Sequence, residues 1–90
     1  MDYGLKGKVV LITGSTGGIG QALCRAFAAE GCKLAISSTS QDKLDAFVPT
    51  LDIASENLRT FIADVTHEDE VKAFVDGAYA AFGHIDIVIP

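Results

Sequence analysis

Basic residues are scarce in this chain: seven lysines and arginines stand against twelve aspartates and glutamates, for a formal net charge of −5. No basic stripe runs along the sequence, so nucleic acid is not expected as a partner. No run of 18 apolar residues occurs, so no segment is expected to span a membrane. The first residues also lack the charged-then-apolar layout of a signal peptide.

Cysteine is rare as well, with Cys24 in a predicted helix and Cys32 just before a predicted strand. Two isolated thiols indicate a reducing cytosol, and hence a cytoplasmic protein, rather than a disulfide framework. We interpret both as small buried hydrophobic residues. The two histidines, His67 and His84, have no cysteine, histidine or carboxylate at ligand spacing, so no metal site is expected.

The sequence is organised around a glycine-rich stretch, residues 8–20. An apolar run predicts a strand, and the residues after the turn follow the spacing of one helix face. These predicted face residues are Ile19, Ala22, Leu23, Ala26 and Phe27. Strand, tight turn and helix would point unpaired helix N–H groups at a ligand above the strand's end. An anion, above all a phosphate, is the natural ligand there.

Three glycines of this turn have separate physical roles. Gly14 allows the sharp turn, Gly18 allows a pyrophosphate to approach the main chain, and Gly20 allows close packing of helix on strand. The spacing is T-G-x-x-x-G-x-G, and no Gly-Lys-Ser/Thr of a Walker A motif follows. The alternative is an ordinary glycine-rich turn, but the flanking strand and helix favour a nucleotide site.

Strands and helices are predicted to alternate along the whole chain. We expect strands over residues 8–13, 33–37, 58–63 and 85–89, and helices over 18–30, from 41 to about 48, and over 67–82. Gly31 suits a helix C-terminus and Ser40 suits an N-cap, and Pro49 should either kink the second helix or stop it near Val48. This alternation predicts a parallel sheet with right-handed crossovers.

The third helix and fourth strand carry further patterns. Residues 66–69 have the [ST]-x-x-[DE] spacing of a helix start. One face of the third helix should be buried through Val71, Phe74, Val75, Ala78 and Phe82. Residues 85–89 are apolar at both parities except for Asp86, as a strand buried on both faces should be. Asp86 and both histidines are interpreted as surface or capping residues.

Residues 13–20, together with residues 5–12 before them, resemble the start of proteins of the short-chain dehydrogenase/reductase family. Within that family, the stretch most resembles the 3-oxoacyl-carrier-protein reductase type. The resemblance runs over essentially all 90 residues. It implies an α/β fold, the first four strands and three helices of a doubly wound Rossmann sheet in the order 3-2-1-4. It also implies an NAD(P)-dependent oxidoreductase that interconverts a carbonyl and an alcohol.

The resemblance further implies which residues bind the cofactor. They are Gly14, Ser15, Thr16, Gly17, Gly18, Ile19 and Gly20 in the turn, Ser38 and Thr39 after the second strand, and Asp64 and Val65 at the adenine. Ser38 stands where a carboxylate would select NAD, which favours NADP. Gly17 and Thr39 stand where arginines often assist NADP binding, and the lack of these arginines weakens the preference. The expected cofactor is NADP, with NAD as the alternative. The serines and threonine could instead be plain loop and capping residues.

The catalytic residues of that family have no counterpart here. Its Tyr-x-x-x-Lys pair is absent, because Tyr3 is followed four residues later by Gly7, and Tyr79 by Gly83. Pro90 stands where the family's Asn-Asn-Ala-Gly motif would begin. We therefore expect residues 1–90 to be the N-terminal, cofactor-binding part of a protein roughly two to three times longer. The complete protein is expected to be a homo-oligomer acting on a small carbonyl or alcohol. The alternatives are a non-catalytic NAD(P)-binding sensor or scaffold, and an inert truncated product.

Overall fold

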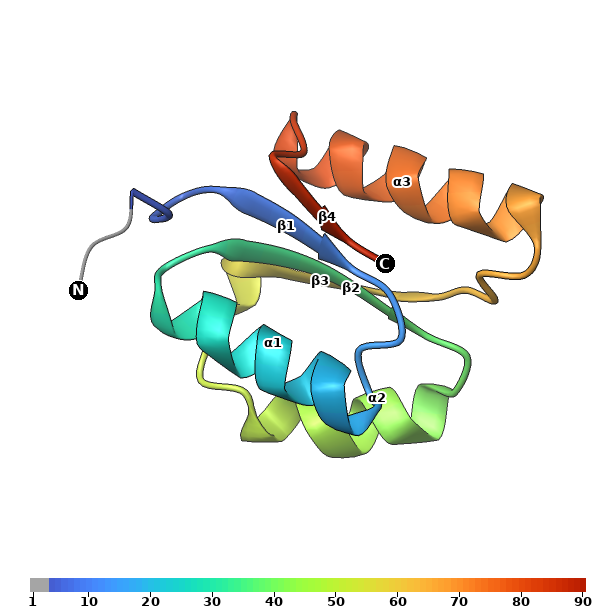
Figure 1. Ribbon diagram of the computed structural model, residues 1–90, viewed down its shortest axis with the longest axis horizontal. Helices are drawn as coiled ribbons and strands as arrows, with labels where there is room; N and C mark the ends of the chain where they lie inside the picture. The colour runs from blue at the N-terminus through green and yellow to red at the C-terminus, as the bar shows by residue number, and fades with distance from the viewer. Residues whose placement is uncertain (1–3) are drawn as a thin grey trace.

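The computed structural model describes residues 4–90, which fold as one parallel sheet with helices on both faces (Figure 1). The strands are β1 (Val9–Ile12), β2 (Lys33–Ser38), β3 (Leu58–Ile62) and β4 (Ile87–Ile89), in the order β3-β2-β1-β4. The helices are α1 (Gly18–Ala29), α2 (Gln41–Phe47) and α3 (Glu68–Phe82), with 3₁₀ turns at Val48–Thr50 and Ser55–Asn57. The predicted fold class and strand order are confirmed. Tyr3 lies outside the described residues.

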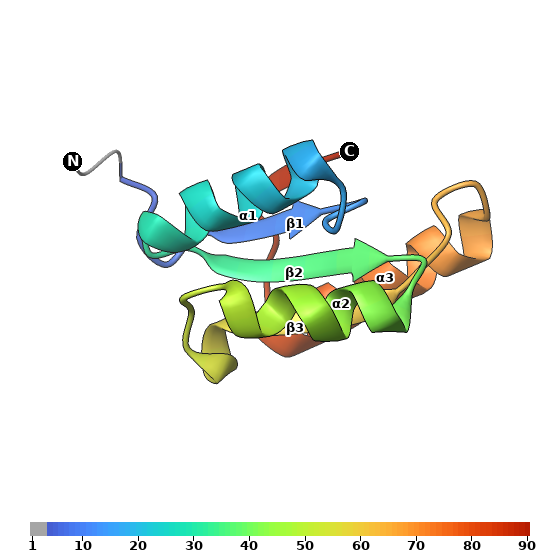
Figure 2. The same ribbon diagram turned by 90° about the horizontal axis from the view of Figure 1, so that it is seen from below.

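The helices divide between the two faces of the sheet. Figures 1 and 2 show α1 and α2 side by side on one face and α3 on the other. Successive residues of a strand point to opposite faces, so Val10 and Ile12 pack in the core under α1 and α2, while Leu11 packs under α3. Strand β1 and residues 34–36 of β2 are therefore apolar at every position, which is the pattern of a parallel sheet covered on both sides.

Several predicted element ends are confirmed by their local bonding. The Ser40 hydroxyl accepts a hydrogen bond from the Lys43 N–H at 3.2 Å, which caps α2. The helix ends at Phe47 and passes into a 3₁₀ turn that contains Pro49. Gly31 follows α1 with φ +80°, a left-handed conformation that favours glycine.

The buried face of α1 is shifted from the predicted one by one position along the helix. Ile19 is 81% exposed, and Ala22 and Ala26 are exposed too. The residues turned toward the sheet are Gly20, Leu23, Cys24, Phe27 and Ala28. Both sets have helical spacing, so the prediction could not separate them by period. Gly20 decides the rotation: a Cβ there would lie 2.3 Å from the Gly14 carbonyl oxygen, so only glycine fits against the turn.

The predicted start of α3 is also corrected. His67 occupies the N-cap position, with no side-chain capping bond, and the helix begins at Glu68. Thr66 does not cap it, because its hydroxyl donates to Asp64 Oδ1 at 2.6 Å. The packed face centres on Phe74 and Ala78, whereas Val75, predicted to be buried, is 36% exposed.

Strand β4 is less buried than predicted. Ile87 and Ile89 are half-buried and Val88 is 58% exposed, since β4 pairs with β1 and lies at the outer position of the described sheet. Asp86 fixes the start of β4: its carboxylate accepts a hydrogen bond from the Val9 N–H at 2.8 Å, and this bond holds the pKa of Asp86 below its usual range.

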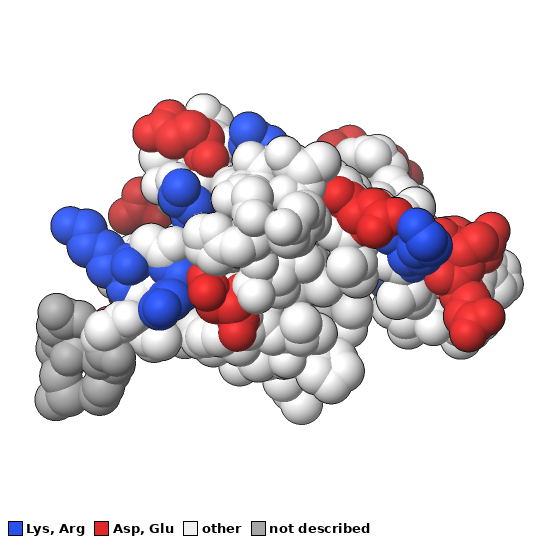
Figure 3. Space-filling view, turned by 90° about the horizontal axis from the view of Figure 1, so that it is seen from above, with Lys and Arg blue, Asp and Glu red and all other residues white. Residues whose placement is uncertain are grey.

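Seen from the α3 side, charged side chains gather toward the ends of the molecule and leave an uncharged area between them (Figure 3).

The two cysteines match their interpretation as buried hydrophobic residues. Both are free and buried, and burial raises the pKa of Cys24 to about 11, which keeps this thiol protonated at neutral pH. Cys32 donates from Sγ to the Leu5 carbonyl at 3.4 Å. Within residues 4–90, none of the helices has the length and apolar character needed to cross a membrane.

Candidate functional site

A hollow of about 260 Å³ opens where the carboxyl ends of the first three strands meet. Its lining comes from the turn after β1, the end of β2 and the segment after β3: Gly14, Thr16, Gly17, Ser38, Thr39, Ala63, Asp64 and Val65. Every lining residue except Ala63 was predicted from the sequence to contact a cofactor. The crevice at the carboxyl ends of strands is where open α/β sheets bind ligands.

Two predicted residues lie behind the turn instead of facing the hollow. The Ser15 N–H and hydroxyl both donate to the Ser37 carbonyl, at 2.9 and 2.8 Å, and Ser15 is fully buried. Gly20 is buried under the turn, against Gly14. Ser15 therefore ties the turn to β2, and Gly20 seats α1 on it. Gly14 makes the turn itself, with φ +60°.

The start of α1 is open to an anion. Gly17 is the N-cap and no side chain caps the helix, so the N–H groups of Gly18, Ile19 and Gly20 have no partner within it. The first turn contains no acidic residue. A Cβ built on Gly18 would meet no atom within 4 Å, so there is free space directly above the main chain. This combination of unpaired donors, helix dipole and space suits a phosphate group.

A pair of hydroxyls lies at the end of β2. Ser38 is only 4% exposed, and its Oγ lies 2.9 Å from Thr16 Oγ1 while accepting from the Ser40 N–H at 3.1 Å. Thr16 is half-buried and Thr39 is exposed. Thr16 is therefore the more accessible hydroxyl of the pair, with Ser38 holding it in place, a division of roles that the sequence did not reveal.

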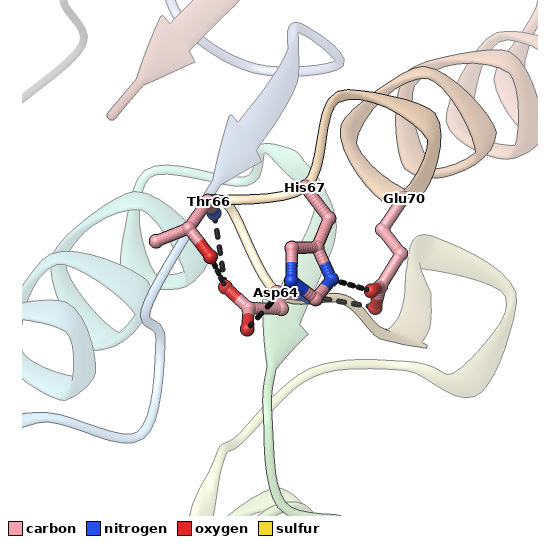
Figure 4. A network of polar contacts seen from close by, with 4 residues as sticks. All are labelled: Asp64, Thr66, His67 and Glu70. Atoms are coloured by element: carbon pink, nitrogen blue, oxygen red, sulfur yellow. Dashed lines mark hydrogen bonds and ion pairs between the residues drawn. The ribbon is translucent and has the colours of Figure 1, made fainter.

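Asp64 belongs to a network of polar contacts that sequence reasoning missed (Figure 4). Its Oδ1 accepts from the Thr66 N–H at 2.9 Å and from the Thr66 hydroxyl, and these bonds lower the pKa of Asp64. Glu70 Oε1 accepts from the Asp64 N–H at 3.0 Å, and Glu70 Oε2 lies 2.6 Å from His67 Nδ1. The only sequence signal was the spacing of Asp64, His67 and Glu70 at three-residue intervals. The network fixes the segment that forms one wall of the hollow.

Each of the two histidines forms an ion pair with a carboxylate, which the sequence analysis did not predict. His67 lies between Asp64 and Glu70, with Nε2 3.9 Å from Asp64 Oδ2, and His84 Nε2 is 2.9 Å from Asp86 Oδ2. In the part of the chain that the structure describes, no three His, Cys, Asp or Glu residues are grouped to hold an ion.

Glu70→Gln is expected to lower the pKa of His67. The hydrogen bond to Glu70, followed by the charge of Asp64, raises the pKa of His67 above its ordinary value of 6.5. A raised folded-state pKa means that protonated His67 stabilises the fold at low pH, and that this contribution is lost as pH rises through the folded-state pKa. An NMR titration of the ring measures the change. Asp76→Asn, which breaks the Lys72 ion pair on the same helix, is the control. An unchanged His67 pKa in Glu70→Gln would contradict the assignment.

Comparison with known proteins finds one family along nearly the whole chain. The short chain dehydrogenase family matches residues 8–90. An uncharacterised oxidoreductase of Staphylococcus haemolyticus is 36% identical over 85 residues, covering 94% of this chain and 36% of the relative. A 3-oxoacyl-[acyl-carrier-protein] reductase of Thermotoga maritima is 33% identical over 85 residues, covering 94% of this chain and 35% of the relative. The chain thus spans about a third of the length of these relatives.

Solved structures with the same arrangement include two close neighbours. A short-chain dehydrogenase/reductase of the glucose/ribitol dehydrogenase type from Brucella melitensis has a TM-score of 0.90 and 32% identity, covering 98% of this chain and 37% of its own. A short-chain dehydrogenase/reductase from Burkholderia phymatum, solved in complex with NAD, has a TM-score of 0.87 and 31% identity, covering 96% of this chain and 31% of its own.

Proposed function

Because this chain belongs to the short-chain dehydrogenase family, we propose that it forms the cofactor-binding part of an NAD(P)-dependent oxidoreductase that interconverts a carbonyl and an alcohol. The observation that carries the proposal is the open hollow at the carboxyl ends of β1, β2 and β3, with unpaired α1 N–H groups beside it. Residues 1–90 would be one Rossmann domain segment, and the remainder of the protein would supply the catalytic side chains.

The residues that would hold the dinucleotide follow from their positions. The N–H groups of Gly18 and Ile19 suit the pyrophosphate, because the space above Gly18 is free. Thr16, Ser38 and Thr39 suit the ribose, since all three line the hollow and the hydroxyl oxygens of Thr16 and Ser38 lie 2.9 Å apart. Asp64 and Val65 suit the adenine, with the carboxylate as acceptor. The bound nicotinamide would supply the hydride chemistry.

Substrate, assembly and location extend the same proposal. A small carbonyl or alcohol is the substrate class, and a 3-oxoacyl group is the candidate that the Thermotoga maritima relative supports. Two free, buried thiols support a reducing, cytoplasmic location. Homo-oligomer formation stays an expectation from the family resemblance.

The proposal is tested by cofactor binding and turnover in the complete protein. We expect NADH or NADPH to bind, and a carbonyl substrate to oxidise the bound reduced cofactor. Binding without turnover on any carbonyl or alcohol would favour the alternative of a non-catalytic sensor or scaffold. Failure to bind either dinucleotide would contradict the proposal outright.

Ser38→Asp is expected to reverse a modest NADPH preference of about tenfold, equivalent to about 1.4 kcal/mol. The Ser40 N–H and the Thr16 hydroxyl, which now surround Ser38 Oγ, would bind the new carboxylate and hold it at the ribose end of the hollow. A carboxylate there repels a 2′-phosphate and accepts from ribose hydroxyls. The measurement is kcat/KM with both cofactors.

Ser38→Asn is the matched control, because asparagine has nearly the same shape as aspartate without the charge. It should not produce the reversal. A wild type that favours NADH, or an unchanged ratio in Ser38→Asp, would show that Ser38 does not set the preference.

A further inference from the structure

A second hollow, a groove of about 350 Å³, lies between α1 and α2, the two helices seen together in Figure 2. It is lined by Thr16, Gln21, Arg25, Lys43, Ala46, Phe47 and Thr50. Two of these side chains are cationic and none is a carboxylate. Thr16 lines both this groove and the candidate cofactor hollow, so the two are neighbours across a single residue.

The two cations of the groove differ in their availability. Arg25 is engaged: it donates from Nη2 to Thr50 Oγ1 at 3.1 Å, and its guanidinium lies 5.2 Å from the centre of the Phe47 ring. Lys43 is exposed, and among residues 4–90 its ammonium has no ion-pair or hydrogen-bond partner. Its backbone is fixed, however, because its N–H donates to Ser40 Oγ. Lys43 is therefore an uncommitted positive charge on a backbone that is held at the start of α2.

Thr16 links this charge to the ribose end of the cofactor hollow. Its hydroxyl lies 2.9 Å from Ser38 Oγ, and its carbonyl accepts from Gln21 Nε2 at 2.9 Å on the groove side. A negative group placed beside the Thr16 and Ser38 hydroxyls would lie next to the groove that Lys43 lines, because Thr16 borders both hollows. A phosphate dianion is the ligand chemistry that combines hydroxyl donors with an ammonium charge.

We propose that Lys43 recognises the 2′-phosphate of NADP and thereby contributes, together with Ser38, to the cofactor preference of this protein. The inference rests on the proposed function and identifies a residue that would distinguish NADP from NAD. No arginine occupies position 17 or 39, and Lys43 provides the missing charge from α2, five residues beyond Ser38. Asp45, a carboxylate on the same helix, accepts a hydrogen bond from Gln41 Nε2 at 2.8 Å and is not an ion-pair partner of Lys43.

The test is equilibrium binding of NADPH and NADH to the complete protein, with 2′,5′-ADP and 5′-AMP as competing probes that isolate the phosphate. Lys43→Gln is expected to weaken NADPH and 2′,5′-ADP binding roughly fivefold, the size of one exposed ion pair. NADH and 5′-AMP binding should not change. Lys43→Arg should keep the preference, and Lys72→Gln, at an exposed lysine of α3, should behave as wild type.

The outcomes separate the two proposals. If the wild type binds both dinucleotides and Lys43→Gln leaves their affinity ratio unchanged, the role of Lys43 is overturned while the cofactor site stands. An equal loss for NADPH and NADH would also overturn it, because that result describes a general contact rather than phosphate recognition. If the wild type binds neither dinucleotide, the proposed function itself fails.

Discussion

Gly18→Val is expected to weaken NAD(P)H binding about a hundredfold, since two hydrogen bonds to a charged group, at about 1.5 kcal/mol each, would be lost. The physical reason is steric. A Cβ on Gly18 meets no protein atom within 4 Å, so a branched side chain would occupy the free space that the pyrophosphate needs. For the same reason the fold should tolerate it, with a change in unfolding free energy within about 0.5 kcal/mol. Titration calorimetry and denaturant unfolding of the complete protein measure the two quantities.

The control for this variant is a change of similar size outside the hollow. Ala22 lies one turn further along α1 and is exposed, so Ala22→Val should leave cofactor affinity unchanged. If Gly18→Val binds cofactor as tightly as the wild type, the glycine turn is not the phosphate site.

Gly20→Ala, in contrast to Gly18→Val, is expected to cause a large decrease in the free energy of unfolding. The added Cβ would lie 2.3 Å from the Gly14 carbonyl oxygen and 2.8 Å from Ser15 Cα. Both are backbone atoms, so the clash is relieved only if α1 moves off the turn. Overpacking of this kind costs about 3 kcal/mol at the upper end of its usual range. The measurement is the unfolding free energy from denaturant titration.

Gly18→Ala adds the same methyl group two residues earlier, into free space, and is the matched comparison for stability. It should unfold at nearly the same denaturant concentration as the wild type. Equal stability of Gly20→Ala and Gly18→Ala would show that close packing of α1 on the turn does not require glycine.

Several features were determined by the sequence alone because they depend on local patterns. The apolar run before Gly14 and the glycine spacing after it predict strand, turn and helix, since each depends on a few consecutive residues. Ser40 and Pro49 fix the ends of α2 through backbone chemistry that requires no distant partner. Alternation of strands and helices then implies a parallel sheet, and most residues of the hollow follow from the ends of those strands.

Other features were decided only by tertiary contacts. Two apolar stripes on α1 share one period, and the contact of Gly20 with Gly14 selects which of them faces the sheet. The exposure of β4 depends on which neighbours flank it, and not on its own apolar residues. The bonds of Asp64 to Thr66 and Glu70 depend on the path of the loop into α3. Lys43 and Thr16 line one groove only because α2 packs beside α1. A one-dimensional pattern gives the period of each element, but the rotation of a helix and the meeting of distant side chains are set by packing in three dimensions.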